Sequence, residues 1–216
     1  LYSTSLDGLT GLDLPIIKSR GARLFHRFTG FDLRMAGADL RLNPHSPFRY
    51  GYQSPFDERA QHAYIAMLRD YVDRFFVQDP EMGQFMPEAH ILPRGLELSA
   101  WEPVGVAPTL RPLVVHAPSN GEVKGSAFVV RALDTLRHEG LAFDFKLLDR
   151  VPHAEAREWY RRADIIVDQL LIGATGVLTL EAWALAKPCV TYLRRDLFEP
   201  FYGVSELPVA NATPDT

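Results

Sequence analysis

Short apolar runs alternate with amphipathic segments along the whole chain. Apolar runs bounded by turn residues predict strands, and apolar positions three or four apart predict helices. The first half predicts a strand at 22–28, a helix at 56–72, a strand at 74–77, a short helix at 80–86 and a strand at 90–92. The second half predicts strands at 113–116 and 143–148 and helices at 124–139 and 152–162. Such alternation is typical of α/β proteins with parallel sheets.

The stretch 163–193 combines a strand, a glycine-bearing turn, a helix and a second strand. Its helix is predicted to begin near Gly176 and to end before Pro188, which cannot continue a helix. Because this helix is apolar on all sides, we expect it to be buried. Its first turn presents free backbone N–H groups and a positive dipole end, which suit a phosphate.

Glycines and prolines interrupt the alternation at residues 96–111, which we interpret as a linker. The linker separates an α/β domain at 1–95 from a second one at 112–216. Residues 38–56, with three prolines, are expected to form an irregular loop. Two such domains predict a cleft, with ligands bound outside the carboxyl ends of the strands.

Glu181 and Lys124 are the first candidates for a role in chemistry. A carboxylate on a buried helix is costly unless it has a partner, so we expect Glu181 to bind a sugar or ribose hydroxyl. The alternative is an ion pair with Lys187 or a nearby arginine. Lys124 follows a strand and a loop containing Gly121, where an ammonium group can neutralise a diphosphate. Its alternative is a solvated surface lysine.

Other polar residues allow simpler interpretations. His26 and His116, near strand ends, are expected to be structural, without the acidic partners of a metal site. Asp32 and Arg34 are expected to form a local cap and an ion pair, although both follow a strand end that faces the cleft. Gly173 is equally compatible with a simple turn.

Composition and missing motifs exclude several classes of function. The 216 residues are 47% hydrophobic and 23% charged, with a net charge of −4 and no basic block, so nucleic acid is a poor candidate partner. The single cysteine, Cys189, excludes a disulfide framework. Dinucleotide, P-loop and nucleophile-elbow motifs are absent, as is an Asp-x-Asp pair for a metal-bound diphosphate. We therefore expect a metal-independent cytoplasmic protein without a cofactor, with at most peripheral membrane contact, and an incomplete chain because it starts at Leu1.

Three segments together resemble glycosyltransferases of the GT-B fold, and most closely family 4. They are FHRFTGFDLR at 25–34, HAPSNGEVKGSAFVVRAL at 116–133 and VPHAEAREWYRRADIIVDQLLIGATGVLTLEAWALAKPCV at 151–190. The resemblance covers about residues 13–200 and is strongest in the last ninety or so. It implies two Rossmann-like domains with parallel sheets, the N-terminal one incomplete here.

The resemblance also implies roles for individual residues. Lys124 would bind the donor phosphates, the amides of Gly176 and Val177 the diphosphate, and Glu181 the ribose. Gly173 stands where the family has a glutamate that contacts the transferred sugar, and Asn120 or Gly121 where it often has an arginine. The expected donor-binding set is Asn120, Gly121, Lys124, Val151, His153, Gly173, Thr175, Gly176, Val177 and Glu181. The expected acceptor side is Thr29, Gly30, Asp32 and Arg34, and the expected catalytic residues are Lys124, Glu181 and His26.

The expected function is transfer of a hexose from a nucleotide-diphosphate sugar to a hydroxyl acceptor, with retention of configuration. The acceptor would be a glycan, a polysaccharide or a glycosylated metabolite. One alternative is a nucleotide-sugar 2-epimerase, which shares the two-domain fold. Another is a non-catalytic nucleotide- or glycan-binding module, which Gly173 and Gly121 suggest.

Overall fold

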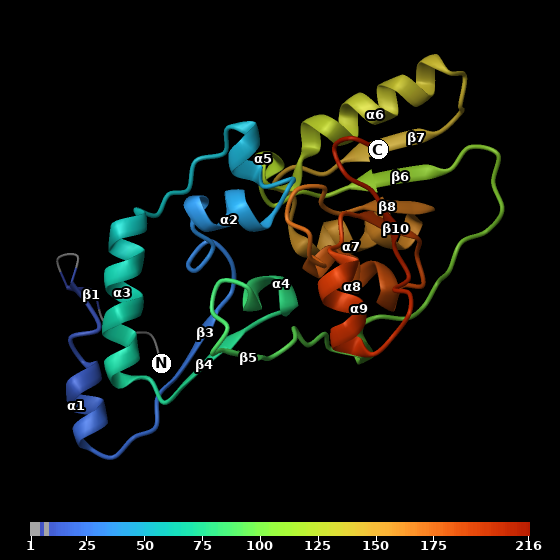
Figure 1. The fold of residues 1–216 in the computed structure, drawn as a ribbon. Coiled ribbons are helices and arrows are strands. Elements are labelled where there is room, and N and C mark those ends of the chain that lie inside the picture. The colour runs from blue at the N-terminus through green and yellow to red at the C-terminus, as the bar shows by residue number, and fades with distance from the viewer. Residues whose placement is uncertain (1–4, 7–8) are drawn as a thin grey trace. The chain divides into compact units, whose positions relative to one another are not determined.

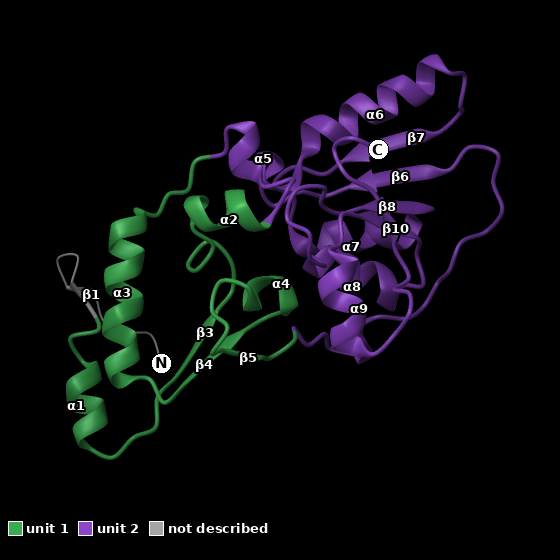
Figure 2. Ribbon diagram, in the orientation of Figure 1, with its two compact units in different colours: residues 1–42, 53–93 green, residues 43–52, 94–216 purple. Residues whose placement is uncertain are grey.

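The computed structural model describes residues 5–6 and 9–216, which form two compact units (Figure 2). Unit 1 contains the chain up to Leu42 together with Gln53–Pro93, and unit 2 contains Asn43–Tyr52 and Arg94–Thr216. The segment Asn43–Tyr52 thus packs with unit 2, although the predicted division at residue 95 assigned it to the first domain.

Unit 1 is built on a parallel sheet with the strand order β3-β4-β5. Its strands are β3 (Phe25–Phe28), β4 (Arg74–Val77) and β5 (His90–Ile91), and its helices are α1 (Leu14–Ser19), α2 (Ala36–Leu42), α3 (Glu58–Tyr71) and α4 (Pro80–Gly83). A short hairpin of β1 (Ser5–Leu6) and β2 (Leu9–Thr10) precedes them. Asp57 starts α3 by accepting a hydrogen bond from the Ala60 N–H at 2.9 Å. The core contains Phe28, Leu68, Val77, Met82 and Met86.

Unit 2 holds a five-stranded parallel sheet with the order β10-β9-β8-β6-β7 (Figure 1). The strands are β6 (Leu113–His116), β7 (Asp144–Leu147), β8 (Ile165–Val167), β9 (Cys189–Thr191) and β10 (Ala210–Asn211). The helices are α5 (Gly121–Lys124), α6 (Ser126–His138), α7 (His153–Arg162), α8 (Val177–Ala184) and α9 (Arg195–Tyr202), with 3₁₀ turns η1 (Pro47–Tyr50) and η2 (Leu98–Ala100).

Successive side chains of the central strands β6 and β8 pack alternately on the two faces of this sheet. Val115 and Ile166 join the core formed with α7 and α8, whereas Val114 and Val167 join the core formed with α6. Because both faces are covered, the central strands β6 and β8 are mainly apolar, as is typical of parallel sheets. Each unit is therefore Rossmann-like, and the predicted α/β fold with parallel sheets is confirmed.

Several elements differ from their predictions. The strands at 74–77 and 113–116 have the predicted bounds, but residues 38–56 are not wholly irregular, since they include most of α2 and all of η1. The prolines suggested a loop, yet Pro47 occupies the first turn of η1, where a missing N–H costs nothing. The helices α1 and α9 were not predicted. Every helix of the described residues is too short or too polar to span a lipid bilayer.

Candidate functional site

The carboxyl edge of the unit 2 sheet gathers the residues of the predicted donor site. The segment after β6 contains α5, which Asn120 caps by accepting hydrogen bonds from the N–H groups of Glu122 and Val123 at 3.0 and 3.2 Å. Lys124 is the last residue of α5, not the first of the long helix as predicted, because Gly125 has a φ of 78° and turns the chain before α6 begins. Gly121 opens α5, and a Cβ there would lie 3.1 Å from Ser126 Oγ.

The Lys124 ammonium group is held by two side chains that follow β8. Its Nζ donates to Asp168 Oδ1 at 2.9 Å and to Gln169 Oε1 at 2.7 Å. The Lys124 side chain is 16% exposed, and Asp168 is buried. Lys124 is therefore neither free in solvent nor an uncompensated charge.

Asp168 also caps α8. Its Oδ2 accepts hydrogen bonds from the Thr179 N–H at 3.2 Å and the Thr179 hydroxyl at 2.7 Å. Burial disfavours the ionised carboxylate, but the attraction of Lys124 and the hydrogen bonds from Lys124 and Thr179 outweigh it, so the pKa of Asp168 lies below its usual value. An internal anion thus occupies part of the helix end that the sequence assigned to phosphate.

Gly176 is the residue before α8 and is packed against this ion pair. A Cβ at this position would collide with the Asp168 carboxylate and lie 2.8 Å from Lys124 Nζ, which explains why a glycine stands here. Among the described residues, no acceptor contacts the N–H of Val177 or Leu178. Val177 is 41% exposed, so the start of α8 remains accessible beside Asp168. The structure therefore brings Lys124, Gly176 and Val177 together as predicted.

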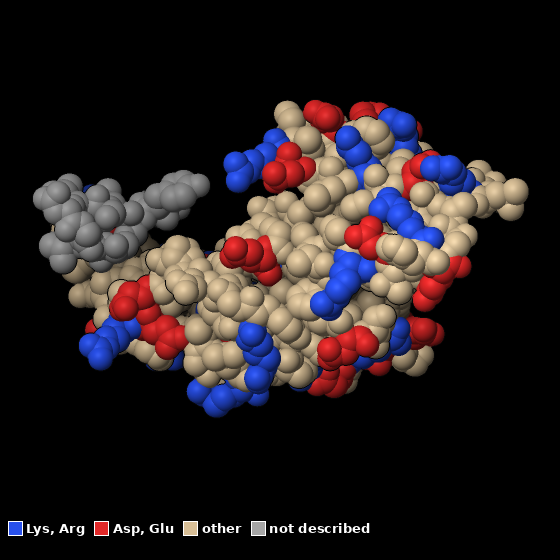
Figure 3. Space-filling model, turned by 90° about the horizontal axis from the view of Figure 1, so that it is seen from above, with Lys and Arg blue, Asp and Glu red and all other residues tan. Residues whose placement is uncertain are grey.

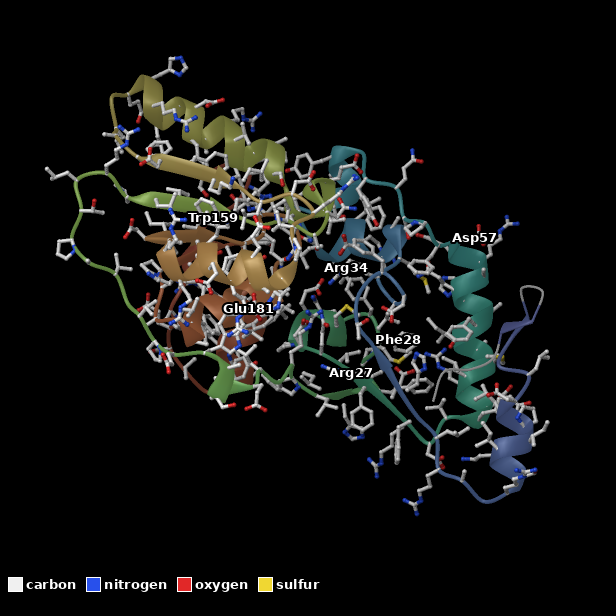
Figure 4. All side chains as sticks on the ribbon, turned by 180° about the vertical axis from the view of Figure 1, so that it is seen from behind. Arg27, Phe28, Arg34, Asp57, Trp159 and Glu181 are labelled. Atoms are coloured by element: carbon white, nitrogen blue, oxygen red, sulfur yellow. The ribbon has the colours of Figure 1, made fainter. Side chains whose placement is uncertain are left out.

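Glu181 is 3% exposed and lies one turn further along α8 (Figure 4). Its partner is neither Lys187 nor an arginine, as the alternative interpretation held, but His153, whose Nε2 lies 2.7 Å from Glu181 Oε1. Burial raises the pKa of Glu181, while the hydrogen bond and charge of His153 oppose the rise. His153 is the first residue of α7 and its side chain is 62% exposed, so this pair connects the protein interior to solvent.

Gly173 has a φ of 74°, in the left-handed region that side chains disfavour. A Cβ would also lie 2.8 Å from Arg194 Cγ and 3.0 Å from Tyr192 Cε1. A glutamate at this position would therefore be strained in the present backbone. Thr175 is half-buried in the same loop, and Val151 packs against the core formed with α7 and α8.

His116 at the end of β6 is fully buried, and its ring nitrogens contact the Val167 carbonyl and Ser126 Oγ, both at 2.8 Å. Because a carbonyl can only accept, Nδ1 carries the proton and Nε2 accepts from the serine hydroxyl. Burial lowers the pKa of His116, consistent with a neutral ring and the structural role expected for it.

The predicted acceptor-side residues all belong to unit 1. The Asp32 carboxylate accepts hydrogen bonds from the N–H groups of Thr29 and Gly30, the nearest at 2.7 Å, which is the expected local cap. His26 lies in β3 with its ring centre 4.4 Å from that of Phe28, and burial lowers its pKa. The structure brings Asp32, Thr29 and Gly30 together but leaves His26 among aromatic rings.

Arg34 is the exception on this side, since it is 3% exposed (Figure 4). Its guanidinium group pairs with Glu81 and lies 3.6 Å from Asp39, so the expected ion pair with Asp32 is wrong. In this arrangement Arg34 lies in the interior of unit 1.

Three contributors to the site had been missed: Asp168, Gln169 and Asn43, whose amide reaches the loop after β8. Polar residues directly after a buried strand were the available signal for the first two. No group of three or more His, Cys, Asp or Glu side chains that could hold a metal occurs in the described part of the chain. On the face shown in Figure 3, acidic and basic side chains are interspersed.

Comparison with known proteins identifies the fold. No protein-family model matches the chain, and no curated protein matches its sequence. Among solved structures, sucrose-phosphate synthase from Thermosynechococcus elongatus is similar, with a TM-score of 0.51 and 13% sequence identity over 94% of this chain. The match spans 63% of that protein's chain, which is less than two thirds of its length. At this identity the similarity concerns the fold alone, which is consistent with Rossmann-like domains of the GT-B kind.

Proposed function

We propose that this protein is a glycosyltransferase that moves a hexose from a nucleoside-diphosphate sugar to a hydroxyl acceptor, with retention of configuration. One observation carries the proposal. The ammonium group of Lys124 lies against the backbone at Gly176, beside the accessible start of α8, at the carboxyl edge of a parallel sheet. The GT-B-like fold supports it.

The chemistry follows from the charge that develops during transfer. As the bond between the sugar and the diphosphate breaks, negative charge grows on the diphosphate oxygens. The N–H groups of Val177 and Leu178 and the Lys124 ammonium would stabilise that charge from fixed positions, without reorganising at the moment of reaction. Asp168 and Gln169 keep the ammonium group in place, and the Asp168 carboxylate neutralises part of its charge.

Glu181 would accept hydrogen bonds from the ribose hydroxyls of the donor. Its burial keeps the carboxylate away from competing water, and His153 orients it from the solvent side. The acceptor would bind near Thr29 and Gly30 in unit 1. Membership in family 4 and a role in polysaccharide synthesis belong to the same proposal.

A binding module without catalysis is the second candidate. Gly173 favours it, since the position that would contact the transferred sugar carries no side chain and tolerates none in this backbone. Release of nucleoside diphosphate from a UDP- or GDP-sugar supports the transferase, and binding without release supports the module.

The substitution Lys124→Ala tests the phosphate role. We expect the affinity for UDP and GDP, measured by isothermal titration calorimetry, to fall at least about tenfold, since a hydrogen bond to a charged group is worth about 1.5–3 kcal/mol. Lys146→Ala is the matched control, because Lys146 is also in unit 2 but lies over the Trp159 ring. Equal affinities of wild type and Lys124→Ala would refute the proposal.

A further inference from the structure

Residues 43–52, here called the strap, belong to unit 2, although the segments directly before and after them in sequence belong to unit 1. The strap follows α2 and precedes α3, two helices of unit 1, yet it packs within unit 2. The connection between the consecutive helices α2 and α3 is residues 43–57, and a connection within one unit has no local reason to pack with another unit. Its contacts therefore need an explanation of their own.

Asn43 makes the most specific of these contacts. The side chain is 3% exposed, and its Nδ2 donates to the Leu171 carbonyl at 2.7 Å. Its Oδ1 accepts from the His45 N–H at 3.0 Å, so the amide is used on both sides. The Leu171 carbonyl is in the loop that leads from β8 to Gly173 and Gly176.

The rest of the strap contacts the segments after the two neighbouring strands. The ring centre of His45 lies 5.0 Å from that of Tyr192, which follows β9. The turn η1 packs against α5, which follows β6, and the Tyr50 ring lies 4.8 Å from Phe128. The strap thus crosses the carboxyl edge of β6, β8 and β9, where parallel sheets bind their ligands.

The loop that Asn43 holds also contacts Lys124. The Leu170 N–H donates to the Lys124 carbonyl at 3.0 Å. A Cβ at Gly125 would lie 3.1 Å from Leu171 Cγ, so the loop rests directly on the turn that carries the lysine. Fixing Leu171 therefore fixes the loop of Gly176 relative to Lys124.

We infer that Asn43 is a positioning residue for the diphosphate site, and that the strap is a structural part of that site. This inference rests on the proposed function for the identity of the ligand. Asn43 touches no diphosphate itself, but acts by holding the Leu171 carbonyl. When the amide donor is lost, this carbonyl has no donor and the loop between β8 and α8 loosens.

The experiment compares Asn43→Asp with Asn211→Asp. The aspartate at 43 can still accept from the His45 N–H but cannot donate to Leu171. Asn211 is a matched control, since its amide also bridges a backbone carbonyl and N–H, those of Leu193 at 3.0 and 2.8 Å. Tyr50→Ala, which loosens the strap at an exposed ring, is a milder second variant in case Asn43→Asp does not fold.

Two readouts separate the positioning role from the function. Hydrogen exchange of residues 169–176 in the free protein should accelerate about tenfold in Asn43→Asp, less in Tyr50→Ala and not in Asn211→Asp. Affinity for UDP and GDP, measured by calorimetry, should fall about fivefold in Asn43→Asp and stay unchanged in Asn211→Asp.

Unchanged exchange at 169–176 in both strap variants, or equal acceleration in Asn211→Asp, would overturn the positioning role. So would accelerated exchange with unaltered nucleotide affinity. If wild type binds neither nucleotide, the proposed function fails, and the exchange comparison still decides whether Asn43 holds the loop.

Discussion

Replacing Asp168 with asparagine removes one charge of a buried pair without changing the shape of the side chain. Asp168 pairs with Lys124, caps α8 through Thr179 and is almost completely buried. The variant leaves the lysine without an anionic partner, while Gln169 Oε1 still accepts its hydrogen bond. We expect Asp168→Asn to destabilise the protein at neutral pH.

The surroundings of Asp168 determine how much unfolding free energy the variant loses. Removing one partner of a buried ion pair costs about 3–5 kcal/mol when the other charge is left without compensation. Here the cost is smaller, about 2–3 kcal/mol, because the Lys124 side chain is 16% exposed and keeps its bond to Gln169. For a chain of this length the loss corresponds to a fall in Tm of about 5–10 °C.

The pH dependence of this stability difference shows whether the loss comes from the charge of Asp168. Because the pKa of Asp168 is lowered in the folded protein, its stabilising contribution is present above the usual carboxyl pKa and is lost as pH falls through the folded value. In urea unfolding, the difference between wild type and Asp168→Asn should therefore shrink between about pH 5 and about pH 3. Asp164→Asn is the control, since Asp164 accepts from the Leu113 N–H at 2.8 Å but has no hydrogen-bonded lysine.

Two results would refute this reasoning. Unfolding free energies of wild type and Asp168→Asn that agree within about 0.5 kcal/mol at pH 7 would show that the pair contributes nothing. A difference that stays constant down to about pH 3 would show that the loss does not come from the charge.

Two further predictions concern Glu81 and Gly173. Burial, opposed by Arg34 and reinforced by Asp79, raises the pKa of Glu81 to about 7, so the folded state retains a proton that the unfolded state loses near the ordinary value of 4.5. The free energy of unfolding should therefore fall as pH rises from about 4.5 to about 7, and Glu81→Gln should lack this fall in urea unfolding followed by circular dichroism. Gly173→Ala should cost about 1–3 kcal/mol in the same assay because of its positive φ and its contact with Arg194. The control Gly30→Ala, with nothing within 4 Å of the added methyl group, should change the free energy of unfolding by less than about 0.5 kcal/mol. An equally small change in Gly173→Ala would show that the backbone at residue 173 is not strained by a side chain.

Sequence reasoning located the elements of the candidate site better than its contacts. The strand before Asp168 and the helix after Gly176 were both predicted, because local periodicity and a single proline encode them. The alternative interpretation of Glu181, an ion pair with Lys187 or an arginine, missed His153, which lies 28 residues away in sequence and which no local pattern relates to Glu181. Asp168 directly follows β8, a local signal that was available, but its bonds to Lys124 and Thr179 depend on the tertiary structure.

The sequence by itself determined the α/β class, the parallel sheets and the glycine-bearing turn between β8 and α8. These features follow from residues that are neighbours in sequence or recur with the period of a strand or helix. Only the tertiary structure decided that Asp168 neutralises Lys124, that Arg34 is internal and that the strap packs with unit 2. The bond from Asn43 to Leu171 joins residues 128 positions apart, and such contacts depend on how the sheet edges and loops pack, which no local pattern records.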